Sequence, residues 1–225
     1  RRAAVPRAHV AGRRRVDAGR VHVRRDDLRL RRLEQRTETT TIFVVDASGS
    51  SAIHRLAEAK GAVELLLADA YVRRDRVALI SFRGKVAEVL LPPTRALALA
   101  KRRLAGAPGG GGTPLASGLD AATALVRDQL RRSHVPTVVV LTDGRANIAL
   151  DGRADRTSAM SDAEAAARRL RATGARSILI DTSPQPDPKA RRIADAMAAQ
   201  YLPLPLAQSS TISAAVKATL AAPSS

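Results

Sequence analysis

Short apolar runs that alternate with helical segments constrain the fold of this chain more than any other feature. Residues 40–45, 76–82 and 137–142 are rich in β-branched and aliphatic side chains and have the length of buried strands. Between the first two runs, residues 51–72 place apolar side chains at helical spacing. This alternation predicts an α/β fold with a mostly parallel sheet and helices on both of its faces.

Turn and capping signals extend this pattern to six strands. The Arg83–Gly84 turn joins residues 76–82 to a strand over residues 86–91, which therefore runs antiparallel, and the prolines at 92–93 end it. Thr94, Thr113 with Pro114 as first helical residue, the capping box Ser161–Glu164 and Asp187 with Pro188 each predict a helix start. The remaining strands are expected at 176–180 and 201–206, and the remaining helix at 210–220. The predicted architecture is a doubly wound, six-stranded, mostly parallel sheet with one antiparallel edge strand.

The first 37 residues differ in composition from the rest, and we expect the folded domain to span residues 38–225. Residues 1–36 hold 13 Arg against four acidic residues. Residues 1–20 lack apolar periodicity and are predicted to be a disordered linker end, whereas residues 21–33 alternate weakly and could add an edge strand. Because the chain has neither an initial Met nor a signal peptide, we expect it to be a fragment of a longer protein.

Composition excludes several classes of function. The chain has no cysteine, which removes disulfide scaffolds, thiolate zinc sites and thiol catalysis, and which fits a reducing compartment; we expect a cytoplasmic protein. No apolar run has the length of a membrane span, so no membrane partner is expected. The net charge of +17 suggests an anionic partner, but Tyr and Phe number only two each, which leaves little for stacking on bases.

Hydroxyl and carboxylate side chains follow two of the predicted strands. Asp46, Ser48 and Ser50 come directly after the first strand, Asp143 follows the strand at 137–142, and Thr113 comes after a glycine run that opens a helix. In open α/β sheets these positions meet in the crevice beyond the carboxyl ends of the strands. Two carboxylates and three hydroxyls are hard ligands that suit Mg²⁺ or Mn²⁺. Each residue also has an ordinary role in a cap or turn, but the joint pattern favours a metal site.

These five residues resemble the metal-ion-dependent adhesion site of the von Willebrand factor A, or integrin I, domain, a Rossmann-like fold. The resemblance covers residues 38–221 and implies that Asp46, Ser48 and Ser50 hold the metal. It further implies that Thr113 and Asp143 bind directly or through water, and that a carboxylate from a partner completes the octahedron.

A narrower resemblance is to the C-terminal domain of the magnesium chelatase D subunit family, in the stretches ETTTIFVVDASGS, GGGGTPLASGL and LTDGRANI. It implies an upstream AAA+-like domain and an acidic linker. It also implies two partners, an AAA+ ATPase subunit and a porphyrin-binding subunit, for ATP-driven insertion of Mg²⁺ into protoporphyrin IX during chlorophyll and bacteriochlorophyll synthesis.

The sequence thus predicts a metal-dependent docking module rather than an active site. No P-loop motif is present, so no nucleotide is expected on this segment. Two alternatives stay open: a domain that binds nucleic acid or an acidic partner through its Arg-rich surface, and a metal-dependent hydrolase, for which no base or nucleophile is evident. Asp181, which ends a strand on the same edge, either lines the partner surface or caps a turn.

Overall fold

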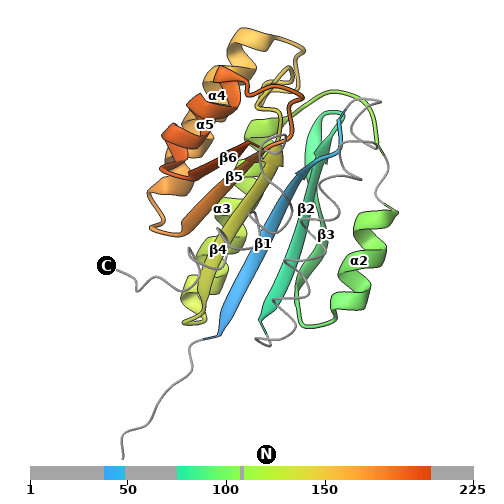
Figure 1. Ribbon diagram of the computed structural model, residues 1–225, viewed down its shortest axis with the longest axis vertical. Coiled ribbons are helices and arrows are strands. Elements are labelled where there is room, and N and C mark those ends of the chain that lie inside the picture. Colours follow the sequence, from blue (N-terminus) through green and yellow to red (C-terminus); the bar gives the residue numbers. More distant parts are fainter. Residues whose placement is uncertain (1–37, 49–74, 107–108, 204–225) are drawn as a thin grey trace, which may run out of the picture. The chain divides into compact units, whose positions relative to one another are not determined.

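The computed structural model describes residues 38–48, 75–106 and 109–203, and these form one six-stranded sheet with helices (Figure 1). The strand order is β3-β2-β1-β4-β5-β6. The strands are β1 (Thr39–Asp46), β2 (Arg76–Arg83), β3 (Val86–Thr94), β4 (Val135–Thr142), β5 (Arg176–Asp181) and β6 (Gln200–Pro203). All neighbouring strands are parallel except β2 and β3. The predicted mixed sheet with one antiparallel edge strand is therefore confirmed.

Four helices are described, and three of them pack together. Helix α4 (Arg156–Arg171) lies between α3 (Leu115–Arg131) and α5 (Pro188–Met197). Helix α2 (Leu97–Ala105) packs against β2 and β3. The helices expected at 51–72 and 210–220 and the edge strand expected at 21–33 lie outside the described residues. No helix in the described part of the chain is long and apolar enough to cross a membrane.

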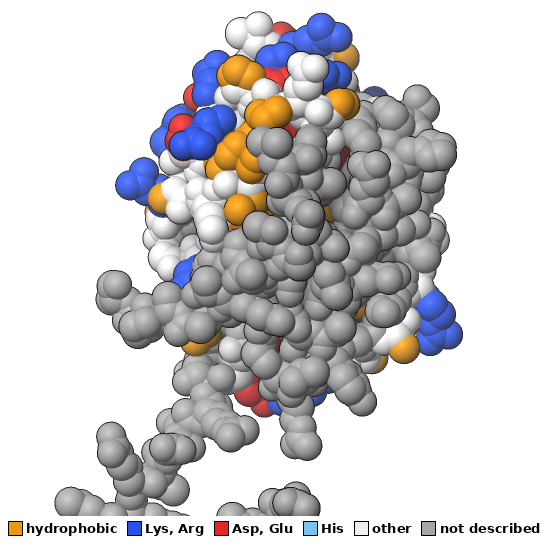
Figure 2. Space-filling view, in the orientation of Figure 1, with side chains coloured by type: hydrophobic (Ala, Val, Ile, Leu, Met, Phe, Trp, Pro, Cys, Tyr) orange, Lys and Arg blue, Asp and Glu red, His pale blue; other side chains and the backbone are white. Residues whose placement is uncertain are grey.

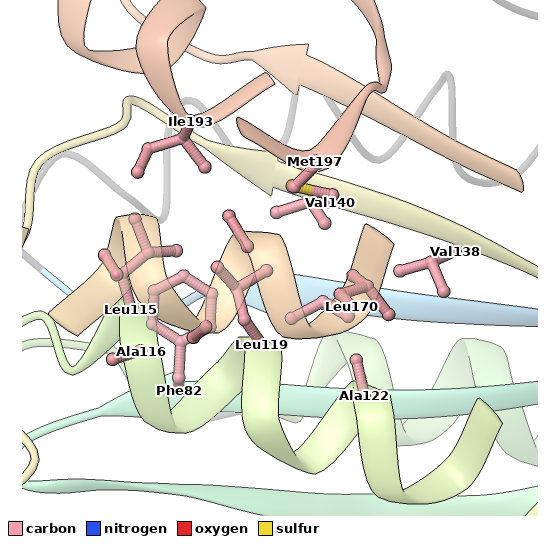
Figure 3. Close-up of a cluster of buried hydrophobic side chains, with 14 of the residues drawn as sticks. Phe82, Leu115, Ala116, Leu119, Ala122, Val138, Val140, Leu170, Ile193 and Met197 are labelled. Carbon is pink, nitrogen blue, oxygen red and sulfur yellow. The ribbon is translucent and has the colours of Figure 1, made fainter. Parts of the chain in front are cut away.

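One hydrophobic core joins the sheet to α3, α4 and α5 (Figure 3). Helix α3 contributes Leu115, Leu119, Ala122 and Val126, which recur at helical spacing and are fully buried. A Cβ on Gly118 would lie 2.7 Å from the Phe82 ring, so this glycine lets α3 approach β2 closely. The core therefore fixes α3, whose first turn follows Thr113, against the strands that carry the candidate site.

The second face of the central strands is buried as well. Phe43 and Val45 on β1, Leu141 on β4 and Ile178 on β5 are at most 2% exposed, although they point away from the core around α3. Burial on both faces explains why the sequence of these strands is continuously apolar rather than alternating.

Strand β3 continues through the two prolines that were predicted to end it. Val77 on β2 pairs with Thr94, and Leu79 pairs with Leu91, so that one β2 residue faces Pro92 and Pro93. This irregularity is a bulge on the edge strand, where a proline that lacks an N–H breaks no regular ladder bond.

The predicted start of α4 at Ser161 is wrong. The helix begins at Arg156, because the Asp155 carboxylate accepts the N–H of Thr157 at 2.9 Å and caps the helix there. Ser161 and Glu164 have capping-box spacing but lie inside the helix. The start predicted for α5 is confirmed, with Asp187 as cap and Pro188 in the first turn.

Candidate metal centre

The candidate centre lies at the carboxyl ends of β1 and β4, which are adjacent parallel strands. Asp46 is the last residue of β1, and Asp143 directly follows β4. The glycine run reaches the same place, because the Gly110 N–H donates to the Ala47 carbonyl at 2.8 Å. The structure thus brings the loops of Asp46, Ser48, Thr113 and Asp143 together, while Ser50 lies outside the described residues.

Hydrogen bonds link the oxygens of three of these residues in a chain. The Asp46 Oδ1 atom accepts the Ser48 N–H at 2.9 Å and the Ser48 hydroxyl at 2.6 Å. The Thr113 hydroxyl donates to the Ser48 Oγ at 2.7 Å. Residues separated by 65 positions in the sequence therefore present adjacent oxygens at one point.

The sequence predicted that Thr113 caps α3, and this prediction is wrong. The residue before the helix is Pro114, and no side chain caps the first turn. The Thr113 hydroxyl is turned toward Ser48 instead, and its backbone is held by Asn147, whose Oδ1 accepts the Thr113 N–H at 2.6 Å. The Asn147 N–H in turn donates to the Thr113 carbonyl at 3.2 Å. The position is thus fixed by the loop after β4 rather than by the helix.

Sequence reasoning missed the parts played by Thr142 and Asn147. The Thr142 hydroxyl donates to Asp46 Oδ2 at 3.0 Å and accepts the Gly144 N–H at 3.1 Å, so it ties the end of β1 to the turn after β4. Thr142 is fully buried. A threonine at the end of a buried strand gives a signal for this role only when the neighbouring strand is known to end in a carboxylate.

The two carboxylates raise each other's electrostatic energy. Burial, together with the negative charge of Asp143, raises the pKa of Asp46 to about 6, against the hydrogen bonds from Ser48 and Thr142 that lower the pKa. Asp143 accepts the Arg145 N–H at 3.0 Å, and its side chain is 16% exposed. A half-buried carboxylate beside a second one is a site that a cation would stabilise.

The donor set fits a divalent cation that prefers oxygen. Neighbouring ligands in an octahedral Mg²⁺ shell of about 2.0–2.1 Å are separated by about 2.9 Å. The oxygens of Asp46, Ser48 and Thr113 are already 2.6 and 2.7 Å apart along the chain of hydrogen bonds. Within the described residues no three His, Cys, Asp or Glu side chains form a cluster, so a metal here would depend on the hydroxyls.

Asp181 caps a turn, which decides between its two predicted roles. It is fully buried, and its carboxylate accepts the N–H groups of Ser183 at 2.8 Å and Asp187 at 3.1 Å. The Tyr201 hydroxyl donates to the same carboxylate at 2.5 Å. Asp181 therefore organises the segment between β5 and α5.

The fold and this arrangement of loops define the class of the protein. Residues 41–145 match the model of the von Willebrand factor type A domain, so the chain contains a domain of this type. Among solved structures, the von Willebrand factor domain of the type V pili tip protein Mfa5 from Porphyromonas gingivalis superposes with a TM-score of 0.60 at 11% identity. That match covers 83% of this chain and 97% of the other. It concerns the fold alone.

Two curated relatives are subunits of the enzyme magnesium chelatase. The chain is 53% identical over 191 residues to the magnesium-chelatase 60 kDa subunit of Cereibacter sphaeroides, covering 85% of this chain and 34% of the relative. It is 50% identical over 185 residues to the subunit of the same name from Rhodobacter capsulatus, covering 82% and 33%. The chain thus spans about a third of the length of these relatives.

Proposed function

We propose that this domain is the metal-dependent docking module of a magnesium chelatase subunit. The observation that carries the proposal is the hydrogen-bonded chain of oxygens from Asp46, Ser48 and Thr113, which lies beside the second carboxylate, Asp143. Relatives at 53% and 50% identity support the choice of magnesium chelatase among proteins with this fold.

In this proposal Asp46, Ser48 and Ser50 hold Mg²⁺ or Mn²⁺, and Thr113 and Asp143 bind the ion directly or through water. The bound ion supplies positive charge that attracts an acidic side chain from a partner. Asp46 and Thr113 are held in place by Thr142 and Asn147, so the oxygens are arranged before the ion arrives.

The proposed partners are the AAA+ ATPase subunit and the porphyrin-binding subunit of the chelatase in the cytoplasm, together with an upstream AAA+-like domain and acidic linker of the same protein. Joining the first two would support ATP-driven insertion of Mg²⁺ into protoporphyrin IX. The role assigned to this chain is assembly.

Docking through the metal is favoured over binding of nucleic acid through the basic surface. Figure 2 shows basic and acidic side chains mixed on the upper part of one face, where Figure 1 places α4 and α5. Arg169 pairs with Asp120 at 2.8 Å, and Arg192 pairs with Glu164. Such pairs neutralise part of the positive field that nucleic acid would need.

The test is co-purification of this chain with the ATPase and porphyrin-binding subunits, in Mg²⁺ and in EDTA. We expect binding in Mg²⁺, loss in EDTA, and loss in Asp46→Ala when circular dichroism shows the fold retained. Arg171→Gln, which changes an exposed side chain at the end of α4, serves as the control and binds as wild type does. Binding that is equal in EDTA, or retained by Asp46→Ala, would refute the proposal.

A further inference from the structure

An exposed arginine lies beside one of the two carboxylates of the candidate centre. The Arg145 Nε atom is 3.7 Å from Asp143 Oδ2, and the Arg145 side chain is 63% exposed. The residue belongs to the loop after β4. Asn147, two positions after Arg145, fixes this loop to Thr113. A positive charge so close to a proposed ligand opposes the entry of a cation, and its presence calls for a physical reason.

The charges of the complete complex supply that reason. Two carboxylates balance one divalent ion, so the centre is neutral when Mg²⁺ binds alone. A third carboxylate from a partner adds one uncompensated negative charge at a partly buried place. A guanidinium beside Asp143 compensates that charge, and its exposed side chain is accessible to the incoming group.

We propose that Arg145 makes metal binding and partner binding depend on each other, an inference that rests on the function proposed above. Arg145 disfavours Mg²⁺ alone, because it repels the ion and pairs with Asp143. It favours Mg²⁺ together with a partner carboxylate, because the ternary complex otherwise carries excess negative charge. By linkage, the same residue then makes the partner's affinity depend on the ion.

Further exposed cations near the centre indicate what kind of segment docks there. The turn between β2 and β3 lies against the glycine run, since a Cβ on Gly112 would be 2.6 Å from the Gly84 carbonyl oxygen. Arg83 and Lys85 flank Gly84 and are both exposed. With Arg145, the loops around the centre thus carry three exposed cations, which fits an acidic peptide segment with several carboxylates rather than a single isolated one.

The test measures the Mg²⁺ dissociation constant of the whole chain by calorimetry, without and with a short Gly/Ser peptide that carries one Glu flanked by Asp residues. Without peptide, we expect Arg145→Gln to bind Mg²⁺ about two- to fivefold more tightly than wild type. With saturating peptide, we expect it to bind Mg²⁺ about three- to fivefold more weakly. A merely structural role would change both constants in the same direction.

Arg171→Gln is the matched control, because it removes an exposed guanidinium from the end of α4. This end precedes the start of β5, whereas the candidate centre lies at the carboxyl ends of the strands. It leaves both constants unchanged. Equal constants for wild type and Arg145→Gln, or a change of the same sign in both conditions, overturn the inference.

The remaining outcomes separate this inference from the proposed function. If wild type binds Mg²⁺ but never the peptide, docking itself fails. If Mg²⁺-dependent peptide binding persists unchanged in Arg145→Gln, only the role of Arg145 fails.

A peptide with Glu alone should bind more weakly than the acidic one, and the double variant Arg83→Gln with Lys85→Gln should remove this difference. Tighter binding of a single-stranded oligonucleotide that ignores EDTA contradicts an acidic peptide as the occupant.

Discussion

The Thr142 hydroxyl donates a hydrogen bond of 3.0 Å to the Asp46 carboxylate, which joins the last residue of β4 to the last residue of β1. Because the same hydroxyl accepts the Gly144 N–H, the end of β1 and the turn that carries Asp143 are held as one unit. The carboxylates of the candidate centre therefore keep their relative positions through a residue that is not itself a proposed ligand.

Removing this hydroxyl should weaken both the fold and the site. Thr142→Val keeps the shape of the side chain but leaves the buried Gly144 N–H and one Asp46 oxygen without this partner, which typically costs about 1–3 kcal/mol. We expect a loss of that size in urea denaturation and a weaker Mg²⁺ affinity in calorimetry. Thr142→Ser retains the hydroxyl and should recover most of the Mg²⁺ affinity; equal affinity in Thr142→Val and wild type would show that the hydroxyl does not orient Asp46.

The metal-free domain should lose stability as the pH rises through the pKa of Asp46. The pKa of about 6 in the folded state lies above the ordinary value of 3.8, so the folded state binds more protons between these two values. The contribution of Asp46 to the free energy of unfolding is fully present below about pH 4 and is lost by about pH 7. It amounts to about 3 kcal/mol. Urea denaturation in EDTA at several pH values measures it.

Asp46→Asn isolates the contribution of this one group. The variant should lack that part of the pH dependence, and near pH 7 in EDTA it should be more stable than wild type. An identical pH profile for the two proteins would mean that Asp46 is not the group responsible.

Gly144 should tolerate a side chain far less well than Gly152 does. Both have a positive φ, 73° and 81°, which disfavours any residue with a Cβ. A Cβ on Gly144 would lie 2.3 Å from the Ala190 nitrogen in α5, whereas a Cβ on Gly152 meets nothing within 4 Å. Gly152→Ala should therefore cost about 1 kcal/mol, and Gly144→Ala about 1–3 kcal/mol more.

The difference between these two glycine variants in urea denaturation isolates the contact between the turn after β4 and α5. Equal losses would show that the backbone angle alone requires glycine at both positions.

Asp181 should matter for stability and not for the ion. Tyr201→Phe removes the hydroxyl that donates to Asp181, and we expect a loss of about 1 kcal/mol with an unchanged Mg²⁺ affinity. Burial and the hydrogen bond to Asp181 both raise the pKa of the Tyr201 phenol, so ultraviolet titration should show one tyrosine that ionises well above the usual range. A marked loss of Mg²⁺ affinity in Tyr201→Phe would place Asp181 in the metal site after all.

The sequence predicted the sheet well because its central strands are apolar on both faces, a pattern that few other structures produce. Capping signals were less reliable, since they depend on where a short side chain turns. Thr113 stands where a helix cap is expected, yet its hydroxyl donates a hydrogen bond to Ser48. The helix that contains Ser161 is capped earlier, by Asp155. Local rules fail at these positions because a competing partner is close in space and distant in sequence.

That the loops of Asp46, Thr113 and Asp143 come together could also be predicted, because the residues that follow each strand of a parallel sheet meet at one edge. The contacts that hold those residues in place could not be predicted. The contacts of Thr142 with Asp46 and of Asn147 with Thr113 join different loops, and no spacing within one loop reveals them. Metal binding by these residues, the part played by Ser50 and the nature of the extension before residue 38 stay predictions.

The most direct test of the central claim is a calorimetric titration of Mg²⁺ into the EDTA-treated chain near pH 7, compared with Asp46→Ala and Asp143→Ala. The oxygens contributed by three loops should bind one ion in wild type, and neither variant should bind it while circular dichroism shows both folded. A wild-type chain that takes up no Mg²⁺, or an Asp46→Ala variant that binds it as tightly, would contradict a metal centre at the ends of β1 and β4.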